Sequence, residues 1–288
     1  MNPSPAQVAA RVIAATERGE RIYAAVVTAS PDPSLIGRRR WLSRGRHGGT
    51  LGSPSLDGEV AAALPALFPP RESRGALSRD FDYRDGDRPG TATVYIELHG
   101  PPAGMVIVGA GHIAVPLSRL GDMLALRVEV LDDRPAFANR DRFPAASAVR
   151  VIDFRDPFAD TPLAPRDHVV LVTRGHSFDY ECLVRLLRMA SRPHYIGMIG
   201  SRRRVRATHE QLLREGFAPE DMGRVRAPVG LDLGGRTPAE IAVAVAAEII
   251  MLRAGGTGVP LVEKERVVER FFGGRNPAGA APSRSSDE

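Results

Sequence analysis

Short apolar runs alternate with amphipathic stretches along the second part of the chain. The apolar runs predict strands at 105–108, 127–131, 148–152, 168–172 and 195–199. Apolar positions at helical spacing predict helices at 113–126, 179–190, 202–215 and 238–253. Buried strands that alternate with helices are typical of a parallel, doubly wound α/β sheet. We therefore predict a Rossmann-like domain at residues 104–255.

The first part of the chain has a different pattern. It predicts a helix at 5–18, a buried strand at 21–29, a strand within RRRWLS followed by the turn-rich RGRHGG, and a helix at 56–67. Residues 69–90 are rich in Pro, Gly, Asp and Arg, which favours a loop or linker. Residues 91–99 alternate β-formers up to the break at Pro101–Pro102.

These patterns divide the chain into four parts. We predict a smaller N-terminal α/β domain at 1–68, a linker with a connecting strand at 69–103, the Rossmann-like domain at 104–255 and an extension at 256–288. The end of the extension, from Asn276, is low in apolar residues, so we expect it to be disordered.

Composition narrows the class of protein. Hydrophobic residues make up 43% of the chain and charged residues 25%, as in soluble globular proteins. No apolar run is long enough for a membrane span, and the N-terminus lacks an apolar signal core, so we expect a cytoplasmic protein. The net charge is +5, but the arginines are scattered instead of forming a stripe. We therefore expect no nucleic-acid partner.

The single cysteine excludes an internal disulfide and a thiolate zinc cluster. Cys182 falls among leucines on a predicted helix, which indicates a buried, inert thiol. We predict no metal site.

The segment MVIVGAGHIA carries the strongest motif. Gly109, Gly111 and Ala114 fit Gly-x-Gly-x-x-Ala between an apolar strand and a helix, and the next strand ends in Asp132. The glycines permit a tight turn and the approach of a pyrophosphate, and helix N–H groups then face the anion. Asp132 is predicted to accept from ribose hydroxyls. The alternative is a doubly wound domain with an empty, degenerate site.

Further polar segments follow the other strands and should meet at the same edge of the sheet. They complete the set of predicted cofactor-binding residues, which is Gly109, Gly111, His112, Ala114, Asp132, Asp133, Arg134, Thr173, His176, Asp179, Gly200, Ser201, Arg202, Arg203 and Asp232.

Several of these residues also have purely structural interpretations. Ser201, with Arg202 and Arg203, fits either a phosphate site or a helix N-cap with solvated arginines. His176 and Asp179 are weak catalytic candidates, as a proton donor and its orienting carboxylate, or they fix a loop. His112 either faces a ligand or caps the helix.

Thr237, Pro238 and Glu240 form a capping signature. We favour this structural role over a ligand role for Glu240.

The ordered segments VIVGAGHIA, VLDDRPAFANRDRFP, VTRGHSFD, YIGMIGSRRR and APVGLDLGGRTPAEIAVAVAAEI resemble the XdhC/CoxI family. Members are accessory proteins of xanthine dehydrogenase and of aerobic carbon monoxide dehydrogenase. The resemblance implies a maturation factor that binds molybdopterin or molybdopterin cytosine dinucleotide, presents it for sulfuration and helps to insert it. It also implies a molybdenum hydroxylase apo-enzyme, a cysteine desulfurase, and a homo-oligomer or paralogue complex as partners.

The N-terminal part departs from the family pattern. Members usually carry a segment similar to Gly-Gly-Cys-x-Glu, and here GTLGSPSLDGEV places Ser55 at the cysteine and Asp57 near the glutamate. Because a serine hydroxyl is a poor ligand for a soft metal, this branch is not expected to ligate molybdenum through that position. Two other interpretations stay open, namely an NAD(P)-dependent oxidoreductase and a nucleotide-binding regulatory protein.

Overall fold

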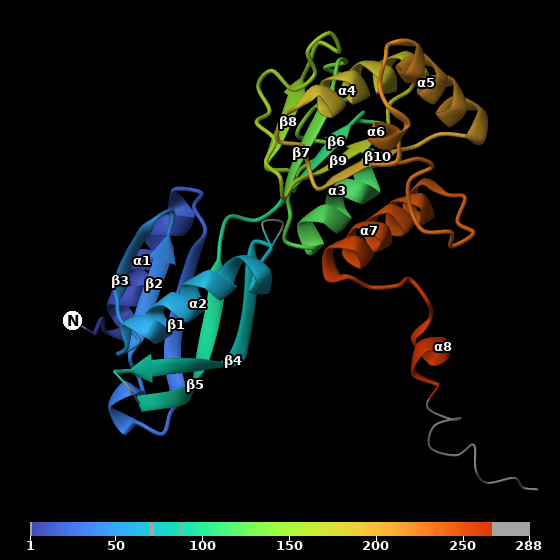
Figure 1. Ribbon diagram of the computed structural model, residues 1–288. Coiled ribbons are helices and arrows are strands. Elements are labelled where there is room, and N and C mark those ends of the chain that lie inside the picture. Colours follow the sequence, from blue (N-terminus) through green and yellow to red (C-terminus); the bar gives the residue numbers. More distant parts are fainter. Residues whose placement is uncertain (1, 70–71, 87, 267–288) are drawn as a thin grey trace, which may run out of the picture.

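The computed structural model describes residues 2–69, 72–86 and 88–266, and Figure 1 shows two α/β units along the chain. In these ranges no helix combines the length and the apolar character that crossing a membrane requires. The predicted disorder at the end of the extension, from Asn276, lies outside the described residues.

The N-terminal unit is a five-stranded antiparallel sheet with strand order β3-β2-β1-β5-β4. The core between the sheet and α2 contains Leu56, Val60 and Leu64 from the helix. The elements are α1 (Pro5–Glu17), β1 (Ile22–Ala29), the 3-10 turn η1 (Pro33–Leu35), β2 (Arg39–Ser43), β3 (Arg46–Gly49), α2 (Pro54–Leu67), β4 (Arg74–Asp85) and β5 (Arg88–His99).

The linker prediction for residues 69–90 is wrong. Residues 74–85 form the edge strand β4, which pairs with β5 along its whole length. Phe81 and Tyr83 point into the core, while Asp80 and Asp82 on the opposite face accept hydrogen bonds from threonines of β5. The charged outer face of this strand hid its alternation within a turn-rich composition. The N-terminal unit therefore reaches His99.

The C-terminal unit contains a six-stranded sheet, β11-β10-β9-β6-β7-β8, in which every pairing is parallel. This confirms the predicted doubly wound α/β fold. Its elements are β6 (Gly104–Val108), α3 (Ala114–Met123), β7 (Arg127–Asp132), β8 (Ala148–Val151), β9 (His168–Leu171), α4 (His176–Arg188), β10 (Tyr195–Met198), α5 (Arg202–Arg214), α6 (Pro219–Met222), β11 (Val225–Arg226), α7 (Pro238–Ala254) and α8 (Leu261–Glu265). The short elements α6 and β11 had no counterpart in the sequence prediction.

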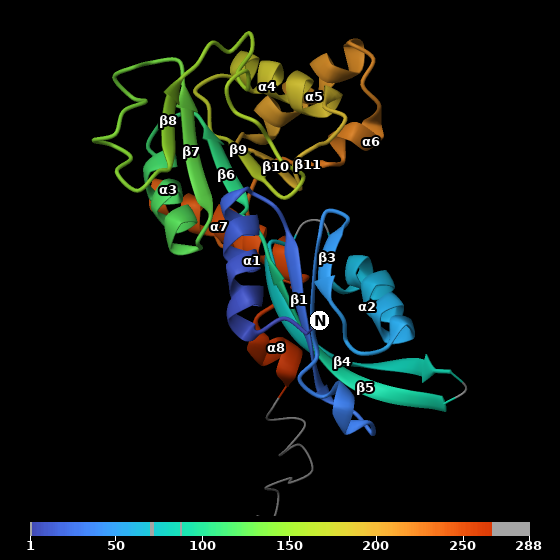
Figure 2. The same cartoon turned by 90° about the vertical axis from the view of Figure 1, so that its left-hand side faces the viewer.

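Helices cover both faces of this sheet, as Figures 1 and 2 show. Met105 and Ile107 of β6 face the layer of α3 and α7, and Val106 and Val108 face the layer of α4 and α5. Cys182 lies in the second layer and is fully buried, as predicted. Burial on both faces explains why these strands are continuously apolar.

The order of the strands creates a crevice at one edge of the sheet. From the central strand β6 the chain builds one half through β7 and β8, then crosses back to build the other half from β9 onward. The connections after β6 and β9 therefore leave in opposite directions at the carboxyl ends of two neighbouring strands. Ligands of open α/β sheets bind at such a switch point.

Candidate functional site

The glycine-rich turn after β6 lies at this switch point. Gly109 has φ +104°, and a Cβ added to it would lie 2.5 Å from the carbonyl oxygen of Val172, so only glycine fits. A Cβ on Gly111 would meet no atom within 4 Å, so its surroundings are open. Ala114 is fully buried where α3 packs on the sheet. The turn thus has the geometry that the motif predicts.

Free backbone donors follow the turn. Within the described part of the chain, the N–H groups of Gly111, His112 and Ile113 donate no hydrogen bond. They precede the first turn of α3, where the helix dipole favours negative charge. Such a row of free donors can bind a phosphate.

The carboxylate of Asp132 is already saturated by its own neighbours. Its Oδ2 accepts from the backbone N–H of Ala110 at 2.7 Å and from Nη2 of Arg134 at 2.9 Å. Its Oδ1 accepts from the backbone N–H and from Nε of Arg134, at 3.0 Å and 2.8 Å. Each oxygen has two partners, so a ribose hydroxyl would have to displace Arg134. The ribose role stays a prediction, and in this structure Asp132 positions the glycine-rich turn.

The pKa of Asp132 is lowered by these contacts. Burial alone would raise its pKa, but hydrogen bonds from Arg134 and from the N–H groups of Ala110 and Arg134 outweigh burial and lower the pKa to about 2. The stabilisation is complete above the unfolded-state pKa and is lost as the pH falls through the folded-state value.

We expect Asp132→Asn to cancel part of the acid sensitivity of the protein. Between pH 5 and pH 2 (roughly the window between the two pKa values), the wild type should lose on the order of 2 kcal/mol more unfolding free energy than the variant. Urea titrations at several pH values measure this difference. Parallel pH profiles for both proteins would contradict the role of the carboxylate.

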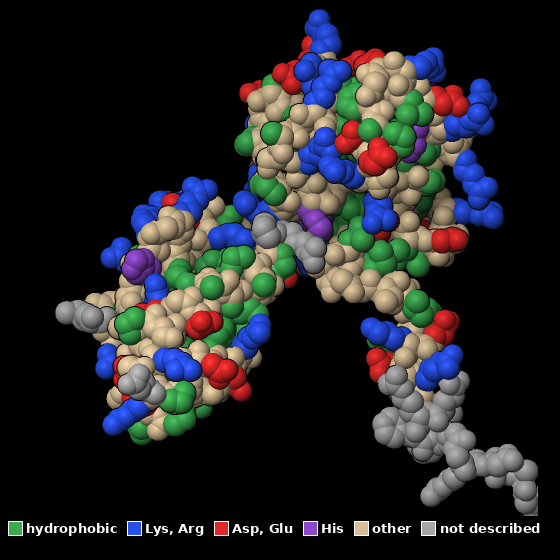
Figure 3. Space-filling view, in the orientation of Figure 1, with side chains coloured by type: hydrophobic (Ala, Val, Ile, Leu, Met, Phe, Trp, Pro, Cys, Tyr) green, Lys and Arg blue, Asp and Glu red, His purple; other side chains and the backbone are tan. Residues whose placement is uncertain are grey.

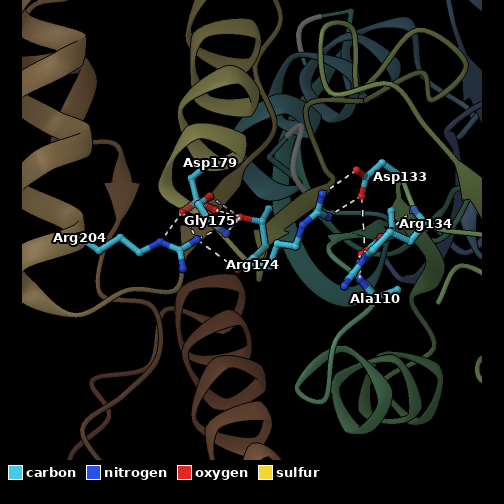
Figure 4. Close-up of polar contacts among 9 residues, drawn as sticks. Ala110, Asp133, Arg134, Arg174, Gly175, Asp179 and Arg204 are labelled. Carbon is cyan, nitrogen blue, oxygen red and sulfur yellow. Dashed lines mark hydrogen bonds and ion pairs between the residues drawn. The ribbon is translucent and has the colours of Figure 1, made fainter. Parts of the chain in front are cut away.

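A second ion pair crosses the crevice beside the first. Arg174, after β9, donates from Nη1 and Nη2 to the two oxygens of Asp133, at 2.5 Å and 2.7 Å. The same guanidinium lies 4.1 Å from the ring centroid of Phe178, and that of Arg134 lies 3.8 Å from the ring centroid of Phe137. Figure 4 shows the hydrogen bonds and ion pairs of this region, from Ala110 and Arg134 through Arg174 to Arg204, as one row across the carboxyl edge. Arg134 and Arg174 are part-exposed, so a ligand phosphate can reach them.

The far end of the row is a buried carboxylate network. Asp179 is fully buried, accepts from the hydroxyl of Thr173 at 2.6 Å and pairs with Arg204 of α5. Burial raises the pKa of Asp179 to about 6, although Thr173 and Arg204 both lower it. His176 is exposed at the start of α4 and does not hydrogen-bond to Asp179. The observed partners of Asp179 therefore favour its structural role over that of a partner for His176.

A hollow of about 540 Å³, lined by three apolar and five polar or charged residues, adjoins this row. Its aromatic walls are Phe154 and Phe178, whose ring centroids are 4.4 Å apart, and Ile152 adds aliphatic surface. Asp133, Asp153 and Glu181 also contribute carboxylates to its lining. The sequence analysis missed this hollow, because its residues come from the ends of β8 and the start of α4 and form no motif.

The side chains of the remaining predicted residues cap a helix or are exposed to solvent. Ser201 is the N-cap of α5 and accepts from the N–H of Arg204 at 3.3 Å, as the structural interpretation predicts. Arg202 and Arg203 are exposed, whereas Arg204, which the sequence analysis did not select, reaches into the network. The other positions are partly buried Gly200, and exposed His112 and Asp232, whose side chains form no hydrogen bond or ion pair with described residues.

The capping signature before the last long helix is confirmed. Thr237 is the N-cap of α7, and Glu240 accepts from the N–H groups of Arg236 and Thr237, both at 2.8 Å. Pro238 occupies the first helical position.

Ser55 and Asp57 lie in the N-terminal unit. Ser55 lines a hollow of about 740 Å³ between α2 and the β4–β5 hairpin and accepts from the N–H of Arg84 at 3.3 Å. Asp57 accepts from the N–H of Leu51 at 2.8 Å and pairs with Arg40 at 3.1 Å. Both side chains have structural partners, and the described residues contain no group of three or more His, Cys, Asp or Glu side chains placed to hold a metal ion.

We expect Ser55→Ala to change the unfolding free energy by less than about 1 kcal/mol, since it removes one long hydrogen bond at a part-exposed site. If the protein has the maturation role that the family resemblance implies, activation of a client enzyme should also be unaffected. Thermal unfolding and a client activation assay test both points. A large loss of activation with normal stability would reveal a functional site in the N-terminal unit.

On the face that Figure 3 presents, Lys and Arg side chains are interspersed with Asp and Glu over both units. The basic residues form no separate patch on this face. This pattern agrees with the scatter of arginines along the sequence.

Fold and site together define an α/β protein with a doubly wound Rossmann domain that has free backbone N–H groups and part-exposed arginines at its switch point. The chain belongs to the XdhC family, since the model of the XdhC Rossmann domain matches residues 105–249.

Two further proteins are similar to parts of this chain. The uncharacterized protein YqeB of Escherichia coli K12 is 29% identical over 215 residues, which cover 73% of this chain and 39% of that protein. A probable xanthine dehydrogenase subunit of Bacillus subtilis 168 is 31% identical over 163 residues, which cover 57% of this chain and 47% of that protein. The matched regions thus span less than half of each relative.

Among solved structures, a xanthine dehydrogenase from Bacillus halodurans superposes with a TM-score of 0.49 at 18% sequence identity. The superposition covers 88% of this chain and 98% of that one.

Proposed function

We propose that this protein is an accessory factor for a molybdenum hydroxylase of the xanthine dehydrogenase type. It would hold molybdopterin or molybdopterin cytosine dinucleotide in the crevice of its Rossmann domain for sulfuration and insertion. Membership of the XdhC family and the name of the Bacillus subtilis relative support the choice of client. The partners would be the apo-enzyme and a cysteine desulfurase.

The observation that carries the proposal is the combination of donors and apolar surface at the switch point. The free N–H groups from Gly111 to Ile113 suit a phosphate, and the part-exposed guanidiniums of Arg134 and Arg174 add positive charge. The hollow beside them offers aromatic walls to a flat heterocycle. A pterin linked to a phosphate has this combination of parts.

In this proposal the chain itself would contribute binding and orientation. The donors bind and orient the phosphate, and Phe154 and Phe178 shield one side of the heterocycle from water. The bound cofactor supplies the molybdenum chemistry after transfer. The described site offers no arrangement that assigns a redox step to this chain, and the geometry favours binding over catalysis.

Calorimetric titration with molybdopterin cytosine dinucleotide, and separately with NADH and NADPH, tests the proposal. We expect saturable binding of the pterin dinucleotide and activation of a purified apo-hydroxylase by the loaded protein. Tight binding of NADH or NADPH, without binding of the pterin dinucleotide, would refute it. That result would instead support an NAD(P)-dependent oxidoreductase or a nucleotide-binding regulatory protein.

One observation favours the phosphorylated nicotinamide nucleotide within that second candidate. Arg134 covers the carboxylate of Asp132, so the end of β7 presents a cation where an unmodified ribose would need an acceptor. An arginine at this place accommodates a 2′-phosphate. If a nicotinamide cofactor binds, NADPH should bind more tightly than NADH.

A further inference from the structure

The hollow beside the crevice is lined by three carboxylates, and arginines already pair with two of them. Asp133 accepts from both terminal nitrogens of Arg174, at 2.5 Å and 2.7 Å. Asp153 accepts from Nε and Nη2 of Arg155, at 2.9 Å and 2.6 Å. Among the described residues, the carboxylate of Glu181 finds no hydrogen bond or ion pair. The unpaired charge in the lining of the hollow is therefore that of Glu181.

A hydroxyl lies beside this carboxylate on the same face of α4. Ser177 and Glu181 are four residues apart in the helix, so their side chains are neighbours, and both line the hollow. Within the part of the chain that the structure describes, the hydroxyl of Ser177 also forms no hydrogen bond. One helix face thus presents a free carboxylate and a free hydroxyl together.

The apolar side chains of the hollow suit a flat ring. Phe154 is 7% exposed, and its ring centroid lies 4.4 Å from that of Phe178. Ile152, which follows β8, adds aliphatic surface. Phe178 is three residues before Glu181 in α4, so the aromatic wall and the free polar groups adjoin each other. A planar ring against this wall can turn a polar edge toward Ser177 and Glu181.

The chemistry of these two groups selects one kind of ring edge. An ionised carboxylate only accepts hydrogen bonds, so two N–H donors side by side satisfy it best. A 2-amino-4-oxopyrimidine ring has such an edge, because its exocyclic amine and the adjacent ring N–H point the same way. Its oxo oxygen, next along the edge, can accept from a hydroxyl. Adenine and cytosine instead place a ring acceptor beside the amine, and the lone pair of that acceptor would face the carboxylate.

We propose that the hollow binds the 2-amino-4-oxopyrimidine edge of a pterin or guanine ring. Glu181 accepts from the amine and from the ring N–H, and Ser177 donates to the oxo oxygen. This inference rests on the proposed function, in which the phosphate of the same ligand binds the N–H groups at the switch point. It assigns the pterin end of a pterin dinucleotide, and not the cytosine end, to the hollow.

Two pairs of ligands that differ at the 2-amino group test this recognition. Pterin is compared with lumazine, which carries an oxo group in place of the amine, and GMP is compared with IMP, which lacks the amine. In at least one pair, the wild type should bind the amino member tighter by about tenfold or more, the equivalent of one hydrogen bond to a charged group. Fluorescence titration measures the pteridines, and calorimetry measures the nucleotides. Equal affinities within both pairs, or binding of none of the four ligands, would overturn the proposal.

Glu181→Gln tests the residue itself. The amide replaces one acceptor by a donor, so the preferred amino ligand should bind about tenfold more weakly and the preference within its pair should disappear. Because Glu181 has no partner among the described residues, thermal unfolding of this variant should match that of the wild type. Glu220→Gln, at an exposed position in α6, is the matched control and should keep every affinity. Retention of the wild-type preference by folded Glu181→Gln would remove Glu181 from the ring site.

Failure of this inference can be told apart from failure of the proposed function. If the wild type and Glu181→Gln bind molybdopterin cytosine dinucleotide equally well, the proposed function stands, but the assignment of the pterin edge to Glu181 is wrong. If GMP is bound and preferred over IMP, while neither pterin nor molybdopterin cytosine dinucleotide binds, recognition of the edge stands. The ligand is then a guanine nucleotide, and the proposed function is wrong.

Discussion

Replacing Arg204 by methionine should destabilise the protein by about 3–5 kcal/mol at neutral pH, because it leaves a buried carboxylate without its cation. Asp179 is fully buried, and its remaining side-chain donor is the hydroxyl of Thr173. Methionine preserves most of the aliphatic volume, so the loss reports the charge. Chemical denaturation measures it.

The pH dependence of this loss follows from the direction in which burial shifts the pKa of Asp179. Burial raises the pKa of Asp179 to about 6 in the folded protein, above its unfolded value, so this group lowers stability as the pH rises through that range. Without Arg204 the pKa should rise further. The difference between wild type and variant should therefore be smaller at pH 5 than at pH 8.

Two matched variants separate this mechanism from a general loss of packing. Arg203→Met removes a neighbouring but exposed arginine and should change stability by no more than about 0.5 kcal/mol. Adding Asp179→Asn to Arg204→Met removes the buried charge and should restore part of the stability. If the double variant is no more stable than Arg204→Met alone, the stranded carboxylate is not the cause.

Replacing Gly111 by valine should abolish ligand binding while it leaves the fold intact. A side chain at this position meets no protein atom within 4 Å at Cβ, so it projects into the open space in front of the free N–H groups. A phosphate would then lose its approach to the backbone, and affinity should fall by at least about a hundredfold, the equivalent of one or two hydrogen bonds to a charged group. Calorimetric titration with molybdopterin cytosine dinucleotide and with NADPH measures the loss.

Gly109 provides the matched comparison in the same turn. Valine there would place Cβ 2.5 Å from the carbonyl oxygen of Val172 in a backbone conformation with φ +104°, so it should destabilise the whole domain. The two glycines thus separate binding from folding. Thermal unfolding should distinguish them, with Gly111→Val close to the wild type. A normal affinity of folded Gly111→Val for every ligand that the wild type binds would place the ligand elsewhere.

Periodicity predicted the C-terminal fold well because both faces of the parallel sheet are buried. Each strand then appears as a continuous apolar run, and β6 ends at the glycine motif where the chain must turn. Strand β4 escaped detection for the opposite reason, although its partner β5 was predicted over residues 91–99. Its outer face carries Asp80, Asp82 and Arg84, so charge and turn-forming residues masked the alternation of Phe81 and Tyr83.

The candidate site was likewise predicted only in part. Sequence position located Asp132 and Asp179 at the carboxyl edge, but the partners of each carboxylate depend on side-chain direction across different elements. Arg204 reaches Asp179 from a helix 25 residues further along the chain, and no local pattern distinguishes it from Arg202 and Arg203. The aromatic hollow likewise depends on Phe154 and Phe178, which meet only in the folded sheet.

Under the proposed function, burial of Cys182 limits how sulfur can reach a ligand in the crevice. Cys182 is enclosed by the core, and burial raises the pKa of its thiol well above the ordinary range, so it offers no thiolate to accept a persulfide. The 288 residues contain no other cysteine. A sulfur atom bound for a ligand in the crevice would therefore have to pass straight from the donor protein, which must itself reach the mouth of the Rossmann domain.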